Sequence, residues 1–369
     1  MKRILSWLLL TATVVSLFGC AAAPAQPETT EALTETAAAE TLATQSAIAE
    51  TEAPVVEGSL FLKVSSITFS LVGESDDIYL GLVPRELVTW ESADPSVVSV
   101  ENGVLTATGV GTTTIRATYY DRQVECTAGC LAATQEELDS LDSEVLCAPK
   151  RLPPEVDLEQ PCTYFDNSAI VGDSITYFLM QWEGKTNYLG NMLFLARGGV
   201  SMNGFVRRFK NICYRGKEMN LEDAIAKSQV ERVYFLMGSN DLSAETQRPY
   251  VFSNWDTMLK RIREKHPTVE IVLMSNIPLY DDAPMTTAND AKIKESNDRI
   301  EAYNEKLKQF AEENGCLFLD LCYYVQDHYN RMPRIYNQGS YHMNEVGCLN
   351  WMKILRYYAQ YESEGGTLS

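Results

Sequence analysis

The chain has 369 residues and a formal net charge of −19, with 45% hydrophobic and 22% charged residues. This composition is typical of a globular protein, and the length is enough for two or three domains. Because so acidic a chain is repelled by phosphate backbones and by anionic lipid headgroups, it is not expected to bind nucleic acid.

Residues 1–20 have the pattern of an export signal. Two basic residues precede an apolar run from Ile4 to Phe18, which is short for a retained membrane span. The run leads into Leu17-Phe-Gly-Cys20, which resembles the lipobox of a bacterial lipoprotein signal peptide. The resemblance implies that Cys20 carries a lipid and anchors the protein to the outer side of the bacterial cell membrane. A simple transmembrane anchor is the alternative.

Residues 21–58 are rich in Ala, Thr, Glu and Pro, and their only charged residues are glutamates. No aromatic residue in this segment could seed a core, so the composition predicts a disordered, acidic tether. A coil of this length reaches roughly 35 Å. The alternative is a helix with alanine-rich faces.

Residues 59–130 favour a small β-sandwich, because short alternating segments are separated by turn residues. Strands are expected at 60–64, 78–82, 88–90, 97–100, 104–108 and 113–119. Asn102-Gly103 predicts a two-residue hairpin turn. The stretch 88–115 resembles the bacterial Ig-like domains of group two, which implies an accessory module that acts as a spacer or binds a surface.

Residues 131–166 are acidic, contain prolines and show weak periodicity, so they are interpreted as an interdomain connector. Apart from Cys20 the chain has eight cysteines, which permits disulfides in an exported protein, although Cys213, Cys316 and Cys348 could equally be buried thiols. Histidines are few, and none has zinc-ligand spacing. Neither a metal nor a cofactor is expected.

Residues 167–369 alternate between apolar strands and amphipathic helices. Five strands are expected at 169–172, 191–196, 233–237, 269–274 and 316–320. Short apolar strands joined by helical crossovers predict a parallel sheet covered on both faces. Ligands in such sheets bind at the carboxyl ends of the strands.

A polar motif stands at the carboxyl end of the first of these strands. Gly172, Asp173 and Ser174 end the strand and begin a helix. A serine there has its hydroxyl at the mouth of the sheet and its own N–H among the unpaired donors of a helix N-terminus. This position suits nucleophilic attack and stabilisation of the resulting oxyanion. Ordinary loop chemistry is the alternative.

Three further motifs follow in chain order. The loop after the second strand contains Gly198 and Gly199, and Gly238-Ser-Asn240-Asp241 follows the third strand. His342 precedes the C-terminal helix. Each has a structural explanation of its own, as a turn glycine, an Asx turn or a helix-start residue. Together they supply a nucleophile, an exposed N–H, an amide donor and a base, which are the groups needed for acyl transfer.

With these residues in place, the C-terminal 200 residues resemble the SGNH or GDSL hydrolase family. The resemblance implies a three-layer α/β/α sandwich with five parallel strands. It also implies Ser174 as the nucleophile and first oxyanion donor, Gly199 as the second donor, Asn240 as the third and His342 as the general base. Gly172, Asp173, Gly238 and Asp241 are expected to support these four residues.

The sequence departs from the family at the acid of the triad. That residue normally lies three positions before the histidine, where this chain has Gly339. A backbone carbonyl, Gln338 or Ser340 could orient His342 instead, or a carboxylate such as Glu345 could replace the acid. Weak or absent activity is the third alternative. Two nearby carboxylates are interpreted as structural, Asp320 and Asp327.

The sequence therefore predicts a membrane-anchored serine esterase that hydrolyses small acyl esters, O-acetyl groups above all, on cell-wall or extracellular glycans. An O-acyltransferase acting on the same glycans is one alternative, because the same residues could transfer the acyl group if water were excluded. A glycan-binding protein of the same fold without catalytic activity is the other.

Overall fold

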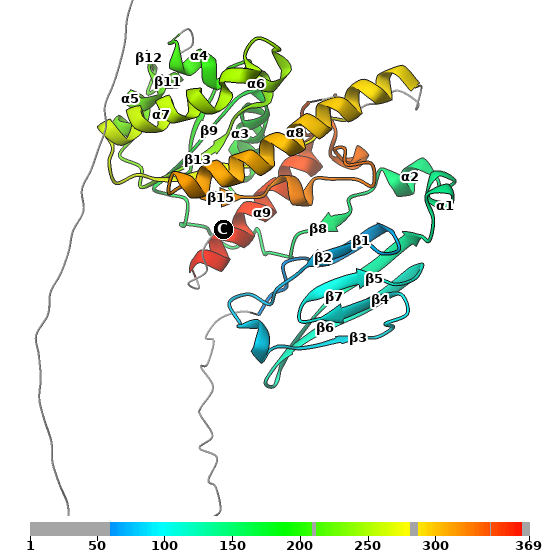
Figure 1. Cartoon of the computed structure of the whole chain (residues 1–369). Coiled ribbons are helices and arrows are strands. Elements are labelled where there is room, and N and C mark those ends of the chain that lie inside the picture. The colour runs from blue at the N-terminus through cyan, green and yellow to red at the C-terminus, as the bar shows by residue number, and fades with distance from the viewer. Residues whose placement is uncertain (1–59, 209–211, 281–286, 340, 364–369) are drawn as a thin grey trace, which may run out of the picture. The chain divides into compact units, whose positions relative to one another are not determined.

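The computed structural model describes residues 60–208, 212–280, 287–339 and 341–363, which belong to one compact unit that spans Pro54–Ser369 (Figure 1). The predicted signal peptide, with Cys20, and the tether lie outside the described residues. None of the helices within the described residues combines the length and the apolar character that a membrane span needs.

The N-terminal strands form two sheets. One has the order β3-β6-β7-β1-β8 and the other the order β2-β5-β4. The strands are β1 (Ser66–Leu71), β2 (Ser75–Asp77), β3 (Thr89–Ser92), β4 (Val98–Glu101), β5 (Val104–Ala107), β6 (Gly111–Tyr119), β7 (Arg122–Ala132) and β8 (Arg151–Leu152). The inward side chains of these strands, among them Ile115 and Leu105, are fully buried. The resemblance to bacterial Ig-like domains stays a prediction.

Two expected strands are wrong. Residues 60–64 and 78–82 contribute only one isolated bridge, between Leu62 and Leu80. Gly81 has a φ of +47°, which is outside the extended region and interrupts the strand there. The strands that replace them in the sheets are β1, which begins after residues 60–64, and β2, which ends directly before residue 78.

The hairpin turn at Asn102-Gly103 is confirmed. Both residues have positive φ values, +48° and +81°, and Glu101 pairs with Val104 across the turn. This is the geometry that Asn-Gly adopts most readily in two-residue hairpins. A Cβ atom at Gly103 would lie 2.5 Å from the carbonyl oxygen of Ile78, so glycine is also required there by close packing.

The C-terminal half contains a parallel five-stranded sheet with the order β10-β9-β13-β14-β15, as predicted. Its strands are β9 (Ser168–Gly172), β10 (Leu193–Ala196), β13 (Arg232–Leu236), β14 (Glu270–Met274) and β15 (Leu317–Leu319). Every residue of β9 is buried, which is expected of a central strand covered on both sides.

Alternate residues of each strand enter two different cores. Ala169 and Val171 pack with helices α5 (Leu221–Ser228), α7 (Val251–Lys265) and α8 (Thr287–Glu313) on one face. The intervening residue Ile170 packs with α3 (Ser174–Thr186) and α9 (Glu345–Ser363) on the other. The sheet therefore lies between two helical layers, which Figure 1 shows on either side of β9 and β13.

Shorter elements complete the fold. These are α1 (Gln135–Asp139), α2 (Ser143–Leu146), α4 (Met202–Val206), the hairpin of β11 (Ile212–Tyr214) and β12 (Lys217–Met219), α6 (Ser239–Ser243), and the 3-10 turns η1 (Arg85–Leu87), η2 (Arg248–Tyr250), η3 (Cys322–Tyr324) and η4 (Arg334–Tyr336). The eight described cysteines are free thiols. Cys348 is buried as expected, Cys316 is partly buried and Cys213 is exposed.

The N-terminal sheets contact the C-terminal half through the tyrosines of η3. The hydroxyl of Tyr324 donates to the carbonyl oxygen of Lys63 over 2.9 Å, and Tyr323 donates to Asp76 over 3.1 Å. The ammonium of Lys63 lies 3.8 Å from the centre of the Tyr323 ring. These buried polar contacts fix the β-domain to the segment that follows β15.

Candidate active site

Ser174 is the first residue of α3, directly after β9, as the sequence predicts. Asp173 is the N-cap, and its Oδ1 accepts a hydrogen bond of 2.9 Å from the N–H of Ile175. The turn requires a glycine before it, because a Cβ atom at Gly172 would lie 1.9 Å from Thr176 Oγ1. The strand end, the cap and the helix start therefore fix the position of the Ser174 backbone.

His342 lies beside Ser174, although 168 positions separate them in the chain. The distance between His342 Nε2 and Ser174 Oγ is 2.9 Å, which is within hydrogen-bond reach. The ring of His342 also packs on Phe178, with ring centres 4.6 Å apart. The sequence analysis did not name Phe178 as a site residue. Its position one helical turn after Ser174 would have indicated that the two side chains share one face of α3.

Burial desolvates the imidazole of His342 and thereby lowers its pKa below the ordinary value of 6.5. An adjacent carboxylate would have the opposite effect. Within the described residues, no hydrogen bond or ion pair joins His342 to a carboxylate. The imidazole is therefore neutral near pH 7, which is the form that can accept a proton.

The segment before His342 contains the position where the family's acid would stand. Gly339 has a φ of +78°, and its carbonyl oxygen accepts a hydrogen bond from the backbone N–H of His342 over 3.1 Å. The side chains of Gln338 and Glu345 are exposed, and neither has a described contact with the imidazole. Ser340 lies outside the described residues.

Asn240 lies at the carboxyl end of β13, in the short helix α6. Its Nδ2 donates to Asp173 Oδ2 over 2.9 Å and to the carbonyl oxygen of Val200 over 2.8 Å. The structure thus brings the Asn240 amide to the cap of the nucleophile helix. To donate to a substrate oxygen, Asn240 must share one of these two hydrogens.

Gly199 belongs to the loop between β10 and α4, and its φ of +64° favours glycine. The same loop is held by Asp241, whose carboxylate accepts hydrogen bonds from the N–H groups of Met202 and Asn203 over 2.8 and 3.0 Å. Asp241 is fully buried, and desolvation raises its pKa. Because Val200 also binds Asn240, the Gly199 loop lies directly beside the Asn240 segment.

Gly238 precedes α6 with a φ of +131°. A Cβ atom at this position would lie 2.6 Å from Asn276 Nδ2 and 2.7 Å from the ring of Tyr303. Tyr303 in turn donates to the carbonyl oxygen of Met237 over 2.8 Å. The close packing under Gly238 sets the direction in which α6 leaves the sheet, and hence the position of Asn240.

The remaining carboxylates lie in other surroundings. Burial raises the pKa of Asp173 to about 6, and the nearby charge of Asp241 adds to this effect. Asp327 binds the N–H groups of Tyr329 and Arg331, and burial raises its pKa to about 6 as well. Asp320 accepts from Ser275. Asp320 and Asp327 both hold the loops after β15 in place, which agrees with the structural role expected for them.

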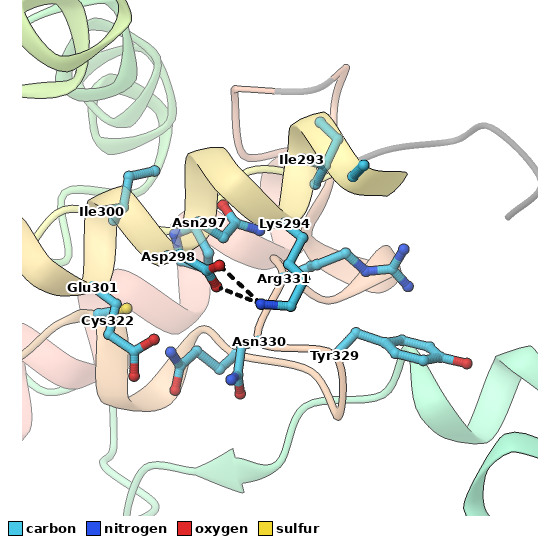
Figure 2. Close-up of a pocket in the computed structure, with 13 residues that line it drawn as sticks. Ile293, Lys294, Asn297, Asp298, Ile300, Glu301, Cys322, Tyr329, Asn330 and Arg331 are labelled. Atoms are coloured by element: carbon cyan, nitrogen blue, oxygen red, sulfur yellow. Dashed lines mark hydrogen bonds and ion pairs between the residues drawn. The ribbon is translucent and has the colours of Figure 1, made fainter. Parts of the chain in front are cut away.

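Residues of α8 line several cavities, and two of these differ in volume and in lining. The larger, about 300 Å³, is lined by Lys294, Asp298 and the segment 329–331, and none of the predicted site residues contributes to it (Figure 2). The smaller, about 150 Å³, includes Ser239 and Tyr341, the chain neighbours of Asn240 and His342. None of the predicted site residues lines the smaller cavity either, but the segments that contain Asn240 and His342 both contribute to it. Among the described residues, no cluster of three or more metal-ligating side chains was found.

The fold and the site together define a parallel α/β protein with a paired serine and histidine at the strand ends. Residues 170–348 match the GDSL-like Lipase/Acylhydrolase family, and this segment is a domain of that family. This segment is accordingly homologous to acylhydrolases, esterases and lipases of the GDSL type. No match was found among the curated proteins.

Several solved structures are similar to this chain. A protein from Bacteroides fragilis described as a candidate acylhydrolase is 17% identical, with a TM-score of 0.43 and coverage of 56% of this chain and 92% of that one. A GDSL-like lipase from Bacteroides thetaiotaomicron is 17% identical, with a TM-score of 0.40 and coverage of 55% and 92%. An extracellular lipase from Streptomyces rimosus is 14% identical, with a TM-score of 0.39 and coverage of 51% and 97%.

Proposed function

We propose that the protein is a serine esterase that removes small acyl groups, acetyl above all, from cell-wall or extracellular glycans. The observation that carries the proposal is the distance of 2.9 Å between Ser174 Oγ and His342 Nε2 at the strand ends of a GDSL-family domain. A hydroxyl becomes an effective nucleophile when a neutral imidazole within hydrogen-bond reach accepts its proton.

In the first half of the reaction, Ser174 Oγ attacks the ester carbonyl while His342 Nε2 takes up the hydroxyl proton. The negative charge that develops on the carbonyl oxygen is stabilised by N–H donors at the start of α3 and in the Gly199 loop, together with the Asn240 amide. The N-terminal end of α3 adds the favourable field of its helix dipole. His342 then gives its proton to the departing sugar hydroxyl, and the acyl group stays on Ser174.

In the second half, water replaces the sugar. His342 accepts a proton from the water molecule, which attacks the acyl carbonyl, and the same donors stabilise the second oxyanion. Collapse of this intermediate releases acetate and returns the proton to Ser174. Because His342 acts alternately as base and acid, its lowered pKa has two effects: the ring is neutral before each proton-accepting step, and the imidazolium is a stronger acid in each proton-donating step.

The choice of a glycan rests on the expected location of the protein. A lipid on Cys20, a tether over residues 21–58 and a β-domain that acts as a spacer would place the esterase among polymers close to the membrane. Replacement of Cys20 by serine is expected to move the protein from the membrane fraction of the cell to the soluble or secreted fraction. An unchanged distribution would contradict lipid anchoring.

A second function is favoured by one observation, that no described carboxylate contacts His342. Without an acid to stabilise the imidazolium, the site would bind acylated glycans and turn them over weakly or not at all. In that case wild type and Ser174→Ala would bind an O-acetylated glycan equally well, and neither would release acetate.

The rate of p-nitrophenyl acetate hydrolysis decides between the two functions. Wild type is compared with Ser174→Ala, His342→Ala and the control Ser253→Ala, whose exposed side chain donates a hydrogen bond to the carbonyl oxygen of Tyr250. An esterase is expected to lose activity by about a thousandfold or more in the first two variants. The control should retain it. Equal rates in all four proteins would contradict the esterase.

The acyl group and the polymer need a second assay. Acetate release from O-acetylated cell-wall glycans is measured beside hydrolysis of p-nitrophenyl esters with longer acyl chains. We expect acetyl esters to be the better substrates. A clear preference for long acyl chains, with no acetate released from any glycan, would leave an esterase of a different substrate class.

A further inference from the structure

The smaller cavity, which is lined in part by the chain neighbours of Asn240 and His342, has an unusual charge for this chain. Its polar lining consists of Ser239, Ser243, Arg248, Ser296, Arg299 and Tyr341. Among the described residues, the lining therefore contains two guanidinium groups, four hydroxyl groups and no carboxylate, in a protein with a net charge of −19. A local positive site in so acidic a chain attracts an anion and gives no such advantage to a neutral ligand.

Arg248 is held so that its outer nitrogens are available. Its Nε donates to the carbonyl oxygen of Leu242 over 2.6 Å, which fixes the plane of the guanidinium. Among the described residues, Arg248 forms no ion pair. Leu242 belongs to α6, the helix that contains Asn240, so the direction of Arg248 is tied to the same helix as the amide donor.

Arg299 approaches the cavity from α8. Its only described ion pair is with Glu295, one helical turn earlier, at 2.7 Å. The side chain of Glu295 is 72% exposed, whereas that of Arg299 is 24% exposed. An ion pair whose acid lies in water is weak, so a ligand anion can replace Glu295 at little cost.

The position of the cavity relates this charge to the reaction. Ser239 precedes Asn240, and Tyr341 precedes His342, so two of the expected site residues have chain neighbours that line the cavity. A substrate that extends from Ser174 towards this cavity would have part of its structure beside Arg248 and Arg299. Guanidinium groups and hydroxyls together match the oxygens of a carboxylate or a phosphate.

We propose that Arg248 and Arg299 select esters that carry an oxyanion, a carboxylate or a phosphate, close to the scissile acyl group. The inference rests on the proposed esterase function and narrows its substrates to acylated anionic polymers. The two arginines bind the anion and take no part in proton transfer. They therefore affect how strongly the enzyme prefers charged esters over neutral ones, as measured by kcat/KM.

The test compares three acetyl esters. These are p-nitrophenyl acetate, its carboxy-substituted analogue with the acid on the ring, and p-acetoxyphenyl phosphate, with acetate release as the common readout. The measured quantity is kcat/KM for each anionic ester divided by kcat/KM for the neutral one. Because a general loss of catalysis cancels in this ratio, the ratio reports anion recognition alone. The two anionic esters separate a carboxylate preference from a phosphate preference.

The variants are Arg248→Gln, Arg299→Gln, Arg299→Lys and the control Lys294→Gln. Lys294 also lies on α8 and also pairs with an acid one turn away, Asp298, but it borders the larger cavity (Figure 2). We expect the ratio for at least one anionic ester to fall about tenfold or more in each glutamine variant of the arginines. Arg299→Lys should retain part of the preference, and Lys294→Gln should retain all of it.

Two results would overturn the inference while leaving the esterase intact. One is an unchanged ratio in both arginine variants. The other is an equal fall of the ratio in Lys294→Gln, which would mean that the preference for anionic esters comes from the electrostatic field of the whole protein. Failure of wild type to hydrolyse any of the three esters would instead contradict the proposed function. In that case calorimetry measures the binding of p-acetoxyphenyl phosphate and of the carboxylate ester to Ser174→Ala and to the double variant Ser174→Ala with Arg299→Gln. Equal affinities of the two proteins for both esters would exclude the anion site.

Discussion

Asp173 accepts a hydrogen bond of 2.9 Å from Asn240, so the cap of the nucleophile helix also orients the expected oxyanion donor. The other oxygen of the same carboxylate accepts from the N–H of Ile175 over 2.9 Å. One buried side chain thus connects the ends of β9 and β13. Loss of either bond would therefore disturb the start of α3 or the Asn240 amide.

The variant Asp173→Asn tests the two roles of Asp173, which are to cap α3 and to orient the Asn240 amide. Asparagine caps a helix about as well as aspartate, so the free energy of unfolding should fall by no more than about 1 kcal/mol. Only one of its two side-chain atoms can accept, so either the cap or the bond to Asn240 is lost. We expect kcat for p-nitrophenyl acetate to fall about tenfold or more with little change in KM. A large rise in KM at constant kcat would contradict this role.

The pH dependence of the reaction should reflect an imidazole without a carboxylate partner. Desolvation lowers the pKa of His342 below 6.5, and the base must be neutral to accept the proton of Ser174. We therefore expect kcat/KM to be maintained as the pH falls through 6.5 and to decline only at lower pH. The measurement is a pH–rate profile for p-nitrophenyl acetate. An acid limb centred above pH 7 would show that a hidden acid raises the pKa.

Gly339→Asp restores a carboxylate at the position where the family has its acid. The φ of +78° is one that Asp and Asn adopt more readily than other side chains, and no atom lies within 4 Å of the added Cβ. A negative charge close to the imidazole raises its pKa and stabilises the imidazolium. The rate should rise by about tenfold at pH 8, and the acid limb should move to higher pH.

Gly339→Asn is the matched control, because it has the same shape and the same backbone strain without the charge. We expect it to resemble wild type in both rate and pH profile. Equal gains in the two variants would assign the effect to the backbone and not to the carboxylate. No gain in either would mean that another group already orients His342.

Much of this architecture follows from local patterns in the sequence. The five parallel strands were predictable because each is a short apolar run that must be covered on both faces. Ser174 and His342 were predictable as a pair because both stand at element starts near the same sheet edge. The position of Arg299 on the smaller cavity was not, since it results from the packing of α8, which no short stretch of sequence encodes.

The misplaced strands have an equally local cause. Residues 78–82 are apolar enough for a strand, but the positive φ of Gly81 turns the chain and leaves pairing to Ser75–Asp77. The absence of a carboxylate at position 339 was evident from the sequence, whereas the group that replaces it depends on contacts that only the folded chain creates. Phe178 likewise became part of the site only when His342 packed on it.

Gly172→Ala tests the junction beneath the nucleophile. The new Cβ would lie 1.9 Å from Thr176 Oγ1 and 3.1 Å from the carbonyl oxygen of Leu236, so α3 or β13 must shift. We expect the free energy of unfolding to fall by about 2 kcal/mol, as overpacking in a core usually produces, and activity to fall with it. Urea denaturation measures the stability change.

Gly184→Ala provides the comparison in the same helix. Nothing lies within 4 Å of its added Cβ, and alanine is a better helix former than glycine, so this variant should gain about 0.7 kcal/mol. Similar losses in both variants would indicate that α3 tolerates no glycine replacement at all, and the argument for close packing at Gly172 would fail.

The buried side chain of His328 should make the free energy of unfolding depend on pH. Its Nδ1 lies 3.0 Å from Ser70 Oγ, and burial together with the charges of Lys150 and Arg151 lowers its pKa to about 4. The ordinary value is 6.5, so between pH 6.5 and 4 the unfolded chain binds a proton that the folded chain does not. The contribution of His328 to stability is therefore lost as the pH falls through this range, by about 3 kcal/mol in total.

Buried carboxyls act in the opposite sense over part of the same range. The pKa values of Asp173 and Asp327 are raised to about 6, so the folded state takes up these protons first as the pH falls. The contribution of His328 is thus isolated by comparing wild type with His328→Asn, which can keep a hydrogen bond to Ser70. Urea denaturation at pH 7 and pH 4.5 should show the smaller loss of stability in the variant. Identical losses in the two proteins would mean that His328 is protonated in the folded state.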